Sequence, residues 1–296
     1  MFYANTTIYF SFFSDIISCV RIGIIYLTIG LYYRSKTIFK GDLNMIVLKD
    51  VGYKPQEQCK LDCYFPETKG FPVIVYFHGG GLETGDKAQT AIVEIAERFV
   101  QNGYGFVSVN YRMYTSGGKY PDYLCDGADS IAFVKNHLSQ YGGNGEIFVA
   151  GKSAGAWISL MLCLNGKYLS DVGIEPLSIG CWIIDSAQAT SHFNVLKYEK
   201  GEDPSAQRID EYAPLYYVGQ STEFSKMLLF FYEDDMPCRP EQNRLFYKAI
   251  KTFHPEAEID YMELPGGHCY GSSRKDEDGE YRFVKETLRW LKKKGL

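Results

Sequence analysis

Residues 147–162 read IFVAGKSAGAWISLML. An apolar run leads into Gly151, a lysine separates that glycine from Ser153, and small residues and an apolar helical pattern follow. A strand, a Gly-x-Ser-x-Gly turn and a helix in direct succession are typical of a nucleophile elbow, whose strained turn needs small neighbours. The same spacing also suits an ordinary tight turn. The rest of the chain has to distinguish these two interpretations.

The composition predicts an ordinary globular α/β protein. The chain has 296 residues, 46% of them hydrophobic, which is enough for one large core. The net charge is −5, and no basic stretch is interleaved with aromatic residues, so nucleic acid is not expected as a partner. The eight cysteines form no paired Cys-x-x-Cys motifs and accompany no histidine cluster. We therefore expect free thiols in a reducing, cytoplasmic compartment and no metal.

Residues 1–44 form a hydrophobic N-terminal extension that Asp15 and Arg21 interrupt. A charge at the centre of a spanning helix costs about 2.5–3.5 kcal/mol, which favours a membrane-associated segment over a membrane-spanning one. A second hypothesis is translated upstream sequence, because residues 40–45, KGDLNM, back-translate to a string with a ribosome-binding GGAG before a start codon at Met45. Mass spectrometry of the native N-terminus tests this hypothesis, and any peptide from before Met45 would refute it.

From Met45 onward, apolar runs alternate with helical patterns. The expected strands are 46–52, 59–65, 73–77, 105–110, 147–151, 179–184, 227–232 and 259–263, and the expected helices are 87–102, 123–141, 154–165, 240–254 and 278–293. This alternation predicts one α/β domain over residues 45–296, with a mostly parallel eight-stranded sheet and helices on both faces. Residues 186–225 are long for one crossover. We expect a small, irregular, lid-like insertion there, beside the carboxyl ends of the strands.

A second glycine-rich turn follows the expected strand 73–77, in the sequence His78-Gly79-Gly80-Gly81. Glycines let backbone N–H groups approach a ligand closely, which suits the oxyanion formed during acyl transfer. A phosphate-binding loop of the Walker type would need Gly-Lys-Ser/Thr after its glycines, and Leu82 and the two residues after it do not supply that. His78 is expected to support the loop rather than act as a base.

Two further loops supply a carboxylate and an imidazole. The expected strand 227–232 is followed by Glu233, Asp234 and Asp235, and a Pro-Gly-Gly loop after the last strand carries His268. The order serine, carboxylate, histidine is that of the α/β-hydrolases and differs from the orders in chymotrypsin and subtilisin. Together with the two glycine turns, these loops favour the elbow.

From about Met45 to the C-terminus the sequence resembles the α/β-hydrolase superfamily. Within it, the sequence is most similar to the hormone-sensitive-lipase-like esterases and the bacterial acetyl- and feruloyl-esterase-like group. The two glycine motifs carry the resemblance, together with Asn110-Tyr111-Arg112, Pro121, Asp126, Ala213-Pro214-Leu215, Asp235, Gln242 and His268.

The resemblance implies Ser153 as the nucleophile, His268 as the general base and acid, and Asp235 as the carboxylate that orients the imidazole. Asp235 is preferred over Asp234 because its spacing to the downstream glutamine fits the family. Asp185, at the end of the expected strand 179–184, is the backup acid, since some hydrolases take the carboxylate from that strand.

The resemblance also implies an oxyanion hole. Its donors are the amides of Gly80, Gly81 and Ala154, with His78 and Gly79 as the supporting loop. The implied reaction is the hydrolysis of small or short-acyl carboxylic esters, such as acetylated carbohydrates or plant-derived esters, through an acyl-enzyme and without a cofactor.

Substrate preference stays open at this level. Lys152, before the serine, and Leu82, after the glycine run, both depart from the residues common in the family. An amidase, a peptidase or an arylformamidase would use the same triad, and a non-catalytic hydrolase-fold binding protein is the alternative outside enzymes. The expected partner is a small-molecule ester. A homodimer is compatible with the sequence, and membrane contact would require a genuine segment 1–44.

Overall fold

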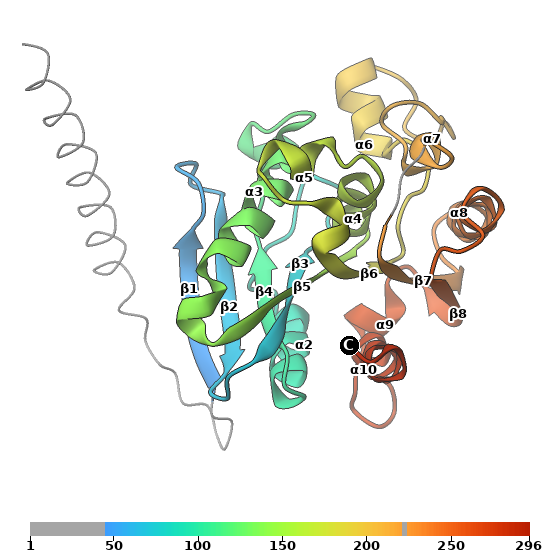
Figure 1. The fold of residues 1–296 in the computed structure, drawn as a ribbon. Coiled ribbons are helices and arrows are strands. Elements are labelled where there is room, and N and C mark those ends of the chain that lie inside the picture. Colours follow the sequence, from blue (N-terminus) through green and yellow to red (C-terminus); the bar gives the residue numbers. More distant parts are fainter. Residues whose placement is uncertain (1–44, 221–223) are drawn as a thin grey trace, which may run out of the picture. The chain divides into compact units, whose positions relative to one another are not determined.

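Eight strands form a sheet in the order β1-β2-β4-β3-β5-β6-β7-β8 (Figure 1). β2 runs antiparallel to both of its neighbours, and the pairs from β4 to β8 are parallel. The strands are β1 (Met45–Gly52), β2 (Lys60–Pro66), β3 (Phe71–Phe77), β4 (Gly105–Val109), β5 (Gly143–Lys152), β6 (Ile179–Asp185), β7 (Lys226–Asp234) and β8 (Ile259–Gly267). The parallel pairs bring the carboxyl ends of β3, β5, β6, β7 and β8 to one edge, where such folds build their sites.

The computed structural model describes residues 45–220 and 224–296. The expectations for residues 1–44, and for the part of the insertion at 221–223, lie outside the described residues. All eight predicted strands and all five predicted long helices occur. The last helix begins later than residue 278 because Gly279 closes a turn in which its N–H donates to Asp276 O at 2.9 Å.

Helices cover both faces of the sheet (Figure 1). α2 (Thr90–Gln101) and α10 (Arg282–Lys294) pack on one face, and α3 (Asp122–His137), α4 (Ala154–Leu164) and α8 (Arg239–Phe253) pack on the other. Tyr247 of α8 contacts Tyr261 of β8, whose ring stacks on Phe231 of β7. Shorter helices are α5 (Lys167–Asp171), α6 (Phe193–Val195), α7 (Pro214–Tyr217) and α9 (Tyr270–Ser273).

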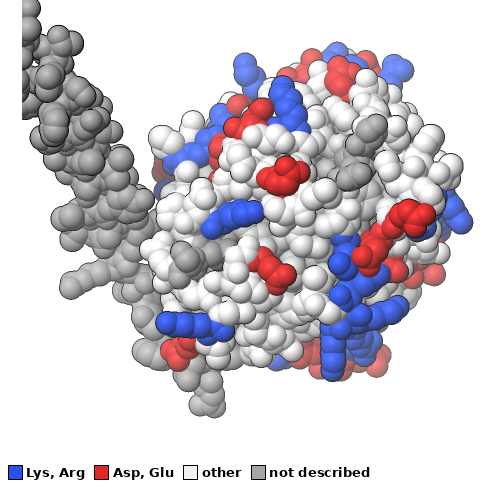
Figure 2. Space-filling view, viewed as in Figure 1, with Lys and Arg blue, Asp and Glu red and all other residues white. Residues whose placement is uncertain are grey.

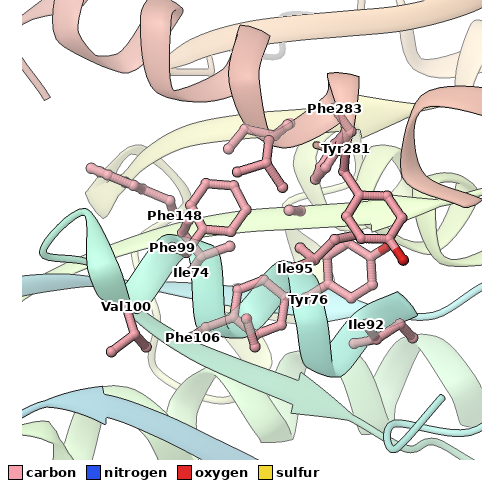
Figure 3. Close-up of a cluster of buried hydrophobic side chains, with 14 of the residues drawn as sticks. Ile74, Tyr76, Ile92, Ile95, Phe99, Val100, Phe106, Phe148, Tyr281 and Phe283 are labelled. Carbon is pink, nitrogen blue, oxygen red and sulfur yellow. The ribbon is translucent and has the colours of Figure 1, made fainter. Parts of the chain in front are cut away.

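A large aromatic cluster fills the space between the sheet and α2 with α10 (Figure 3). Phe99 of α2 stacks on Phe106 of β4, and its ring also meets the edge of Phe283 of α10. Tyr76 of β3 contacts both Phe106 and Phe283. Fully burying an aromatic side chain of this size contributes about 1.5–3 kcal/mol, so this cluster stabilises the packing of α2 and α10 on the sheet.

The segment between β6 and β7 is irregular, as the sequence predicted for residues 186–225. Its described part holds α6, a π-helical turn at Leu196–Lys200 and α7. Buried polar contacts attach it to α8, because Asn243 Nδ2 donates to Ala187 O at 3.0 Å and Gln242 Oε1 accepts from Ala189 N–H at 3.1 Å. The Trp157 indole of α4 also donates to Tyr212 O, at 3.2 Å.

The surface carries charges of both signs. On the face shown in Figure 2, basic and acidic side chains lie side by side, and much of the surface between them is uncharged. This distribution accords with the modest net charge of −5. The seven cysteines of residues 45–220 and 224–296 are free, as the sequence predicted, and five of them are buried. Across these same residues, no helix has both the length and the apolar character that crossing a membrane requires.

Candidate active site

Ser153 lies in a strained turn between β5 and α4. Its φ is +52°, a left-handed value that is uncommon for a residue with a side chain. The turn is tight because a Cβ on Gly155 would lie 2.1 Å from Phe77 O, and one on Gly151 would lie 2.4 Å from Gly155 O. The Ser153 N–H donates to Asp185 O of β6 at 2.8 Å. The geometry is therefore that of an elbow with a raised serine rather than an ordinary turn.

His268 follows β8 and lies between the serine and a carboxylate. Its Nε2 is 2.8 Å from Ser153 Oγ, and its Nδ1 is 2.5 Å from Asp235 Oδ1. Because an ionised carboxylate only accepts, Nδ1 carries the proton of the neutral imidazole, and Nε2 is left to accept the serine O–H. The Asp235 side chain is 0% exposed and that of His268 is 27% exposed, so the imidazole reaches solvent while its carboxylate partner does not.

Among the three acidic residues that end β7 and directly follow it, only the third is turned inward. Glu233 and Asp234 are exposed, while Asp235 Oδ1 also accepts the N–H of Met236 at 2.6 Å. The Asp235 N–H donates to Tyr232 O at 3.3 Å, so the chain has already left the strand direction at this residue. This turn points the third carboxylate at the imidazole.

The glycine loop after β3 lies against the serine. A Cβ on Gly79 would be 3.1 Å from Ser153 Cβ, which places the loop in van der Waals contact with the elbow. Gly80 and Gly81 have φ values of +116° and +66°. The Gly80 carbonyl accepts the N–H groups of Glu83 and Thr84 at 3.1 and 2.9 Å. Within residues 45–220 and 224–296, the amides of Gly80 and Gly81 donate to no protein acceptor, so they remain available to an external oxygen.

Ala154 is the first residue of α4, and Ser153 is the N-cap. The Ala154 amide is therefore one of the free N–H groups at the start of the helix. The first N–H groups of a helix have no partner inside the helix, and the helix dipole adds positive potential there. The structure therefore brings the three predicted oxyanion donors, Gly80, Gly81 and Ala154, to the same side of the fold as Ser153. Such donors stabilise negative charge that develops on a carbonyl oxygen.

His78 is buried beneath the glycine loop. Its Nδ1–H donates to Gly79 O at 2.7 Å, and its ring stacks on Tyr111, whose hydroxyl donates to His78 O at 2.7 Å. Complete burial lowers the pKa of His78 to about 4. A histidine that stays neutral and holds backbone groups supports the loop, which is the role expected from the sequence.

This burial predicts a pH-dependent stability. In the unfolded chain a histidine has a pKa of ~6.5. Between about pH 6.5 and 4 the unfolded state binds a proton that native His78 does not, so the free energy of unfolding falls as the pH drops through this window, by about 3 kcal/mol. Urea unfolding of wild type and of His78→Gln at several pH values measures it. The variant should lose less stability on acidification, and parallel curves would contradict the assignment.

Asp185, the backup acid, lies at the end of β6, and its side chain is completely buried. Its hydrogen-bond partners among the described residues are hydroxyls, those of Ser272 and Ser186 at 2.5 and 3.5 Å and that of Tyr232, and not His268. Burial raises the pKa of Asp185 to about 6. The structure thus brings Asp235, rather than Asp185, to the imidazole.

Lys152 is half-buried beside the serine, and it forms no ion pair with an acidic residue of the described chain. Its positive charge favours the ionised form of the Asp185 carboxyl without a direct contact.

Asn194 carries no sequence motif, yet it contacts the glycine loop. Its Nδ2 donates to Gly81 O at 2.6 Å, and a Cβ on Gly81 would lie 3.1 Å from the ring of Phe193. The insertion between β6 and β7 therefore contacts Gly81, one of the expected oxyanion donors. The local sequence around Asn194 gives no signal for this contact, because burial and partner both depend on the folded chain.

No group of three or more His, Cys, Asp or Glu residues arranged to hold a metal ion occurs in the described part of the chain. The arrangement of serine, imidazole and carboxylate can by itself activate a hydroxyl for attack on a carbonyl.

Known proteins resemble this chain in sequence. Residues 61–177 match the BD-FAE family model. The probable carboxylesterase 7 of Arabidopsis thaliana is 30% identical over 288 residues, which span 84% of this chain and 88% of that protein. A probable isoprenylcysteine alpha-carbonyl methylesterase of Oryza sativa subsp. japonica is 33% identical over 122 residues, or 40% of this chain and 29% of that protein.

Solved structures resemble the chain in three dimensions. Esterase B from Lactobacillus Rhamnosis superposes with a TM-score of 0.67 at 14% identity, covering 95% of this chain and 94% of that chain. The propionate-bound esterase 2 of Thermogutta terrifontis superposes with a TM-score of 0.65 at 19% identity, covering 85% of this chain and 95% of that chain. At these identities the likeness concerns the fold alone.

Proposed function

Since this chain belongs to the carboxylesterases of the α/β-hydrolase fold, we propose that it hydrolyses short-acyl carboxylic esters with a triad of Ser153, His268 and Asp235. The observation that supports the triad is the continuous pair of hydrogen bonds, 2.8 Å from Ser153 Oγ to His268 Nε2 and 2.5 Å from His268 Nδ1 to Asp235 Oδ1. The strained elbow supports the same assignment, because it raises the hydroxyl above the strand ends.

Acylation begins when Ser153 Oγ attacks the carbonyl carbon of the ester and His268 Nε2 takes the hydroxyl proton. The carbonyl oxygen becomes an oxyanion that accepts hydrogen bonds from the amides of Gly80, Gly81 and Ala154. Each such donor is worth about 10²–10³ in rate. Asp235 holds the imidazole in the reactive tautomer and stabilises the imidazolium that forms.

Acylation ends when His268 gives its proton to the oxygen of the leaving alcohol and the bond between that oxygen and the acyl carbon breaks, which leaves the acyl-enzyme. Deacylation then repeats the steps with water in place of the serine hydroxyl. A water molecule then gives a proton to Nε2 and attacks the acyl-enzyme. The second tetrahedral intermediate collapses, His268 gives its proton to Ser153 Oγ, and the acid leaves. No cofactor takes part in this cycle.

The proposed substrates are acetylated carbohydrates or plant-derived esters with a short acyl group. A short acyl group is supported by a protein of the same fold, because the Thermogutta terrifontis esterase 2 has been solved with propionate and with butyrate bound. The methylesterase named among the sequence relatives adds methyl esters to the candidates.

A panel of substrates tests this function. We expect kcat/KM to be highest for p-nitrophenyl acetate, propionate or butyrate and to fall at least tenfold, on the order of 1.4 kcal/mol, for longer acyl chains. Acetylated xylan, feruloyl esters, methyl esters and N-formylkynurenine complete the panel. A preference for N-formylkynurenine, or activity on amides above that on esters, would replace the esterase proposal with an arylformamidase or an amidase.

A further inference from the structure

The end of β6 contacts both the nucleophile turn and the histidine loop. The backbone carbonyl of Asp185 accepts the N–H of Ser153 at 2.8 Å. The carboxylate of the same residue accepts the hydroxyl of Ser272 at 2.5 Å, and Ser272 lies four residues after His268. One residue therefore contacts the two segments whose separation sets the distance from serine to imidazole.

The neighbouring residues add two parallel contacts. Ser186 has a φ of +55°, its Oγ accepts the N–H of Cys269 at 3.0 Å, and its hydroxyl lies 3.5 Å from Asp185 Oδ1. The Gly271 N–H donates to the hydroxyl of Tyr232 on β7 at 3.0 Å. The segment directly after His268 is thus held by hydroxyl groups that come from the ends of β6 and β7.

We propose that Asp185 is a positioning residue for His268, an inference that rests on the triad proposed above. Its carboxylate acts as a hydrogen-bond acceptor that fixes the loop through Ser272 and through Ser186. The loop in turn keeps the imidazole at hydrogen-bond distance from Ser153. Asp185 does not contact the imidazole, whose Nδ1 already donates to Asp235.

The energetics of the carboxyl support this role. Asp185 is completely buried, and no cation of residues 45–220 and 224–296 forms an ion pair with it, although the more distant charge of Lys152 favours its ionised form. Burying such a group is unfavourable unless hydrogen bonds compensate for its lost hydration. Here the donors that compensate it belong to the histidine loop and its neighbours, so the same bonds that satisfy the carboxyl also order the loop.

Variants of Asp185 and Ser272 test the proposal. The amide oxygen of Asp185→Asn can still accept the Ser272 hydroxyl, so we expect this variant to keep kcat for p-nitrophenyl acetate within about threefold. Asp185→Ala removes the acceptor that holds the loop and should lower kcat about 10²-fold with little change in KM. A displacement of the catalytic imidazole by about 1 Å is enough to lower the rate by that factor. Ser272→Ala removes one bond and should lower kcat about tenfold.

A control and a second readout separate the possible results. Ser130→Ala removes a buried hydroxyl that donates to Gly127 O on α3, far along the chain from the loop, and should leave kcat unchanged. The second readout is the rate at which a fluorophosphonate labels Ser153, followed by intact mass. Labelling should be slower in Ser272→Ala than in the wild type, and slowest in Asp185→Ala. Ser272→Ala alters so little volume that it remains informative even where Asp185→Ala fails to fold.

Each other outcome overturns the proposal. If Asp185→Asn loses as much activity as Asp235→Asn, the charge of Asp185 acts in catalysis and its role is not positioning. If Asp185→Ala folds and keeps the wild-type kcat and labelling rate, or if Ser272→Ala does so, the contacts do not position His268. Failure of the wild type to react with the fluorophosphonate would instead contradict the triad itself.

Discussion

Replacing Ser153 with alanine should lower kcat for p-nitrophenyl acetate by about 10⁶-fold, to the level of the assay background. The hydroxyl is the only group of the proposed triad that can form the acyl-enzyme, so the imidazole and the amides would act on water alone. The Ser153 backbone N–H still donates to Asp185 O in the variant, and alanine fits where serine fits. Circular dichroism and thermal unfolding should therefore match those of the wild type.

The neighbouring residue offers a matched control. Lys152 is adjacent in the chain, is half-buried and has no ion-pair partner in the part of the chain that the structure describes. We expect Lys152→Ala to keep kcat and KM close to the wild-type values. Substantial hydrolysis by purified Ser153→Ala, or a loss in Lys152→Ala as large as that in Ser153→Ala, would overturn the assignment of the nucleophile.

Replacing Asp235 with asparagine should lower kcat by about 10⁴-fold. An amide has nearly the same volume, and its oxygen can still accept the Met236 N–H that Asp235 Oδ1 accepts at 2.6 Å. However, an amide NH₂ facing Nδ1 favours the tautomer that carries its proton on Nε2, and that tautomer cannot accept the Ser153 proton. The loss of the buried negative charge also removes the stabilisation of the imidazolium.

The adjacent carboxylate provides the control for this variant. Asp234 is exposed and precedes Asp235 directly, so Asp234→Asn changes the net charge equally without altering the partner of the imidazole. Steady-state kinetics should show a large loss of kcat in Asp235→Asn and a change within about twofold in Asp234→Asn. The reverse pattern would assign the orienting role to Asp234, and equal losses would point to an effect of net charge.

Much of the fold follows from local sequence patterns. Continuous apolar runs in β3, β5, β6 and β7 predict strands covered on both faces, and the structure confirms a mostly parallel sheet between two helix layers. The esterase structures with the same fold confirm the predicted fold class. Strands and helices can be predicted from the sequence because the spacing of apolar residues, which distinguishes them, involves residues close together in the chain.

The two glycine turns are local features as well. The positive φ of Ser153, and the clash that a Cβ on Gly155 would cause with Phe77 O, both belong to the tight turn at the end of β5. Small residues at those positions are necessary for such a turn, so the residue types by themselves indicate the elbow. The backbone of Gly80 and Gly81 is likewise restricted by its own positive φ values.

Local sequence patterns do not predict which side chains pair with one another across the site. Glu233, Asp234 and Asp235 are equivalent by composition, and Asp185 also ends a strand, so the sequence alone left several carboxylates open. The turn after β7 buries only Asp235 and points it at His268, while the carboxylate of Asp185 faces Ser272. These directions depend on how loops from different strands meet, and that depends on contacts between residues far apart in the chain.

The same reason explains Asn194 and Ser272. Asn194 reaches Gly81 across 113 positions of the sequence, and Ser272 reaches Asp185 across 87. Residue type and local spacing carry information about turns and burial, which are set by near neighbours. Hydrogen bonds over such separations form only once the sheet has brought the strand ends together, so the sequence predicted candidate reactive groups and the folded chain set which of them touch.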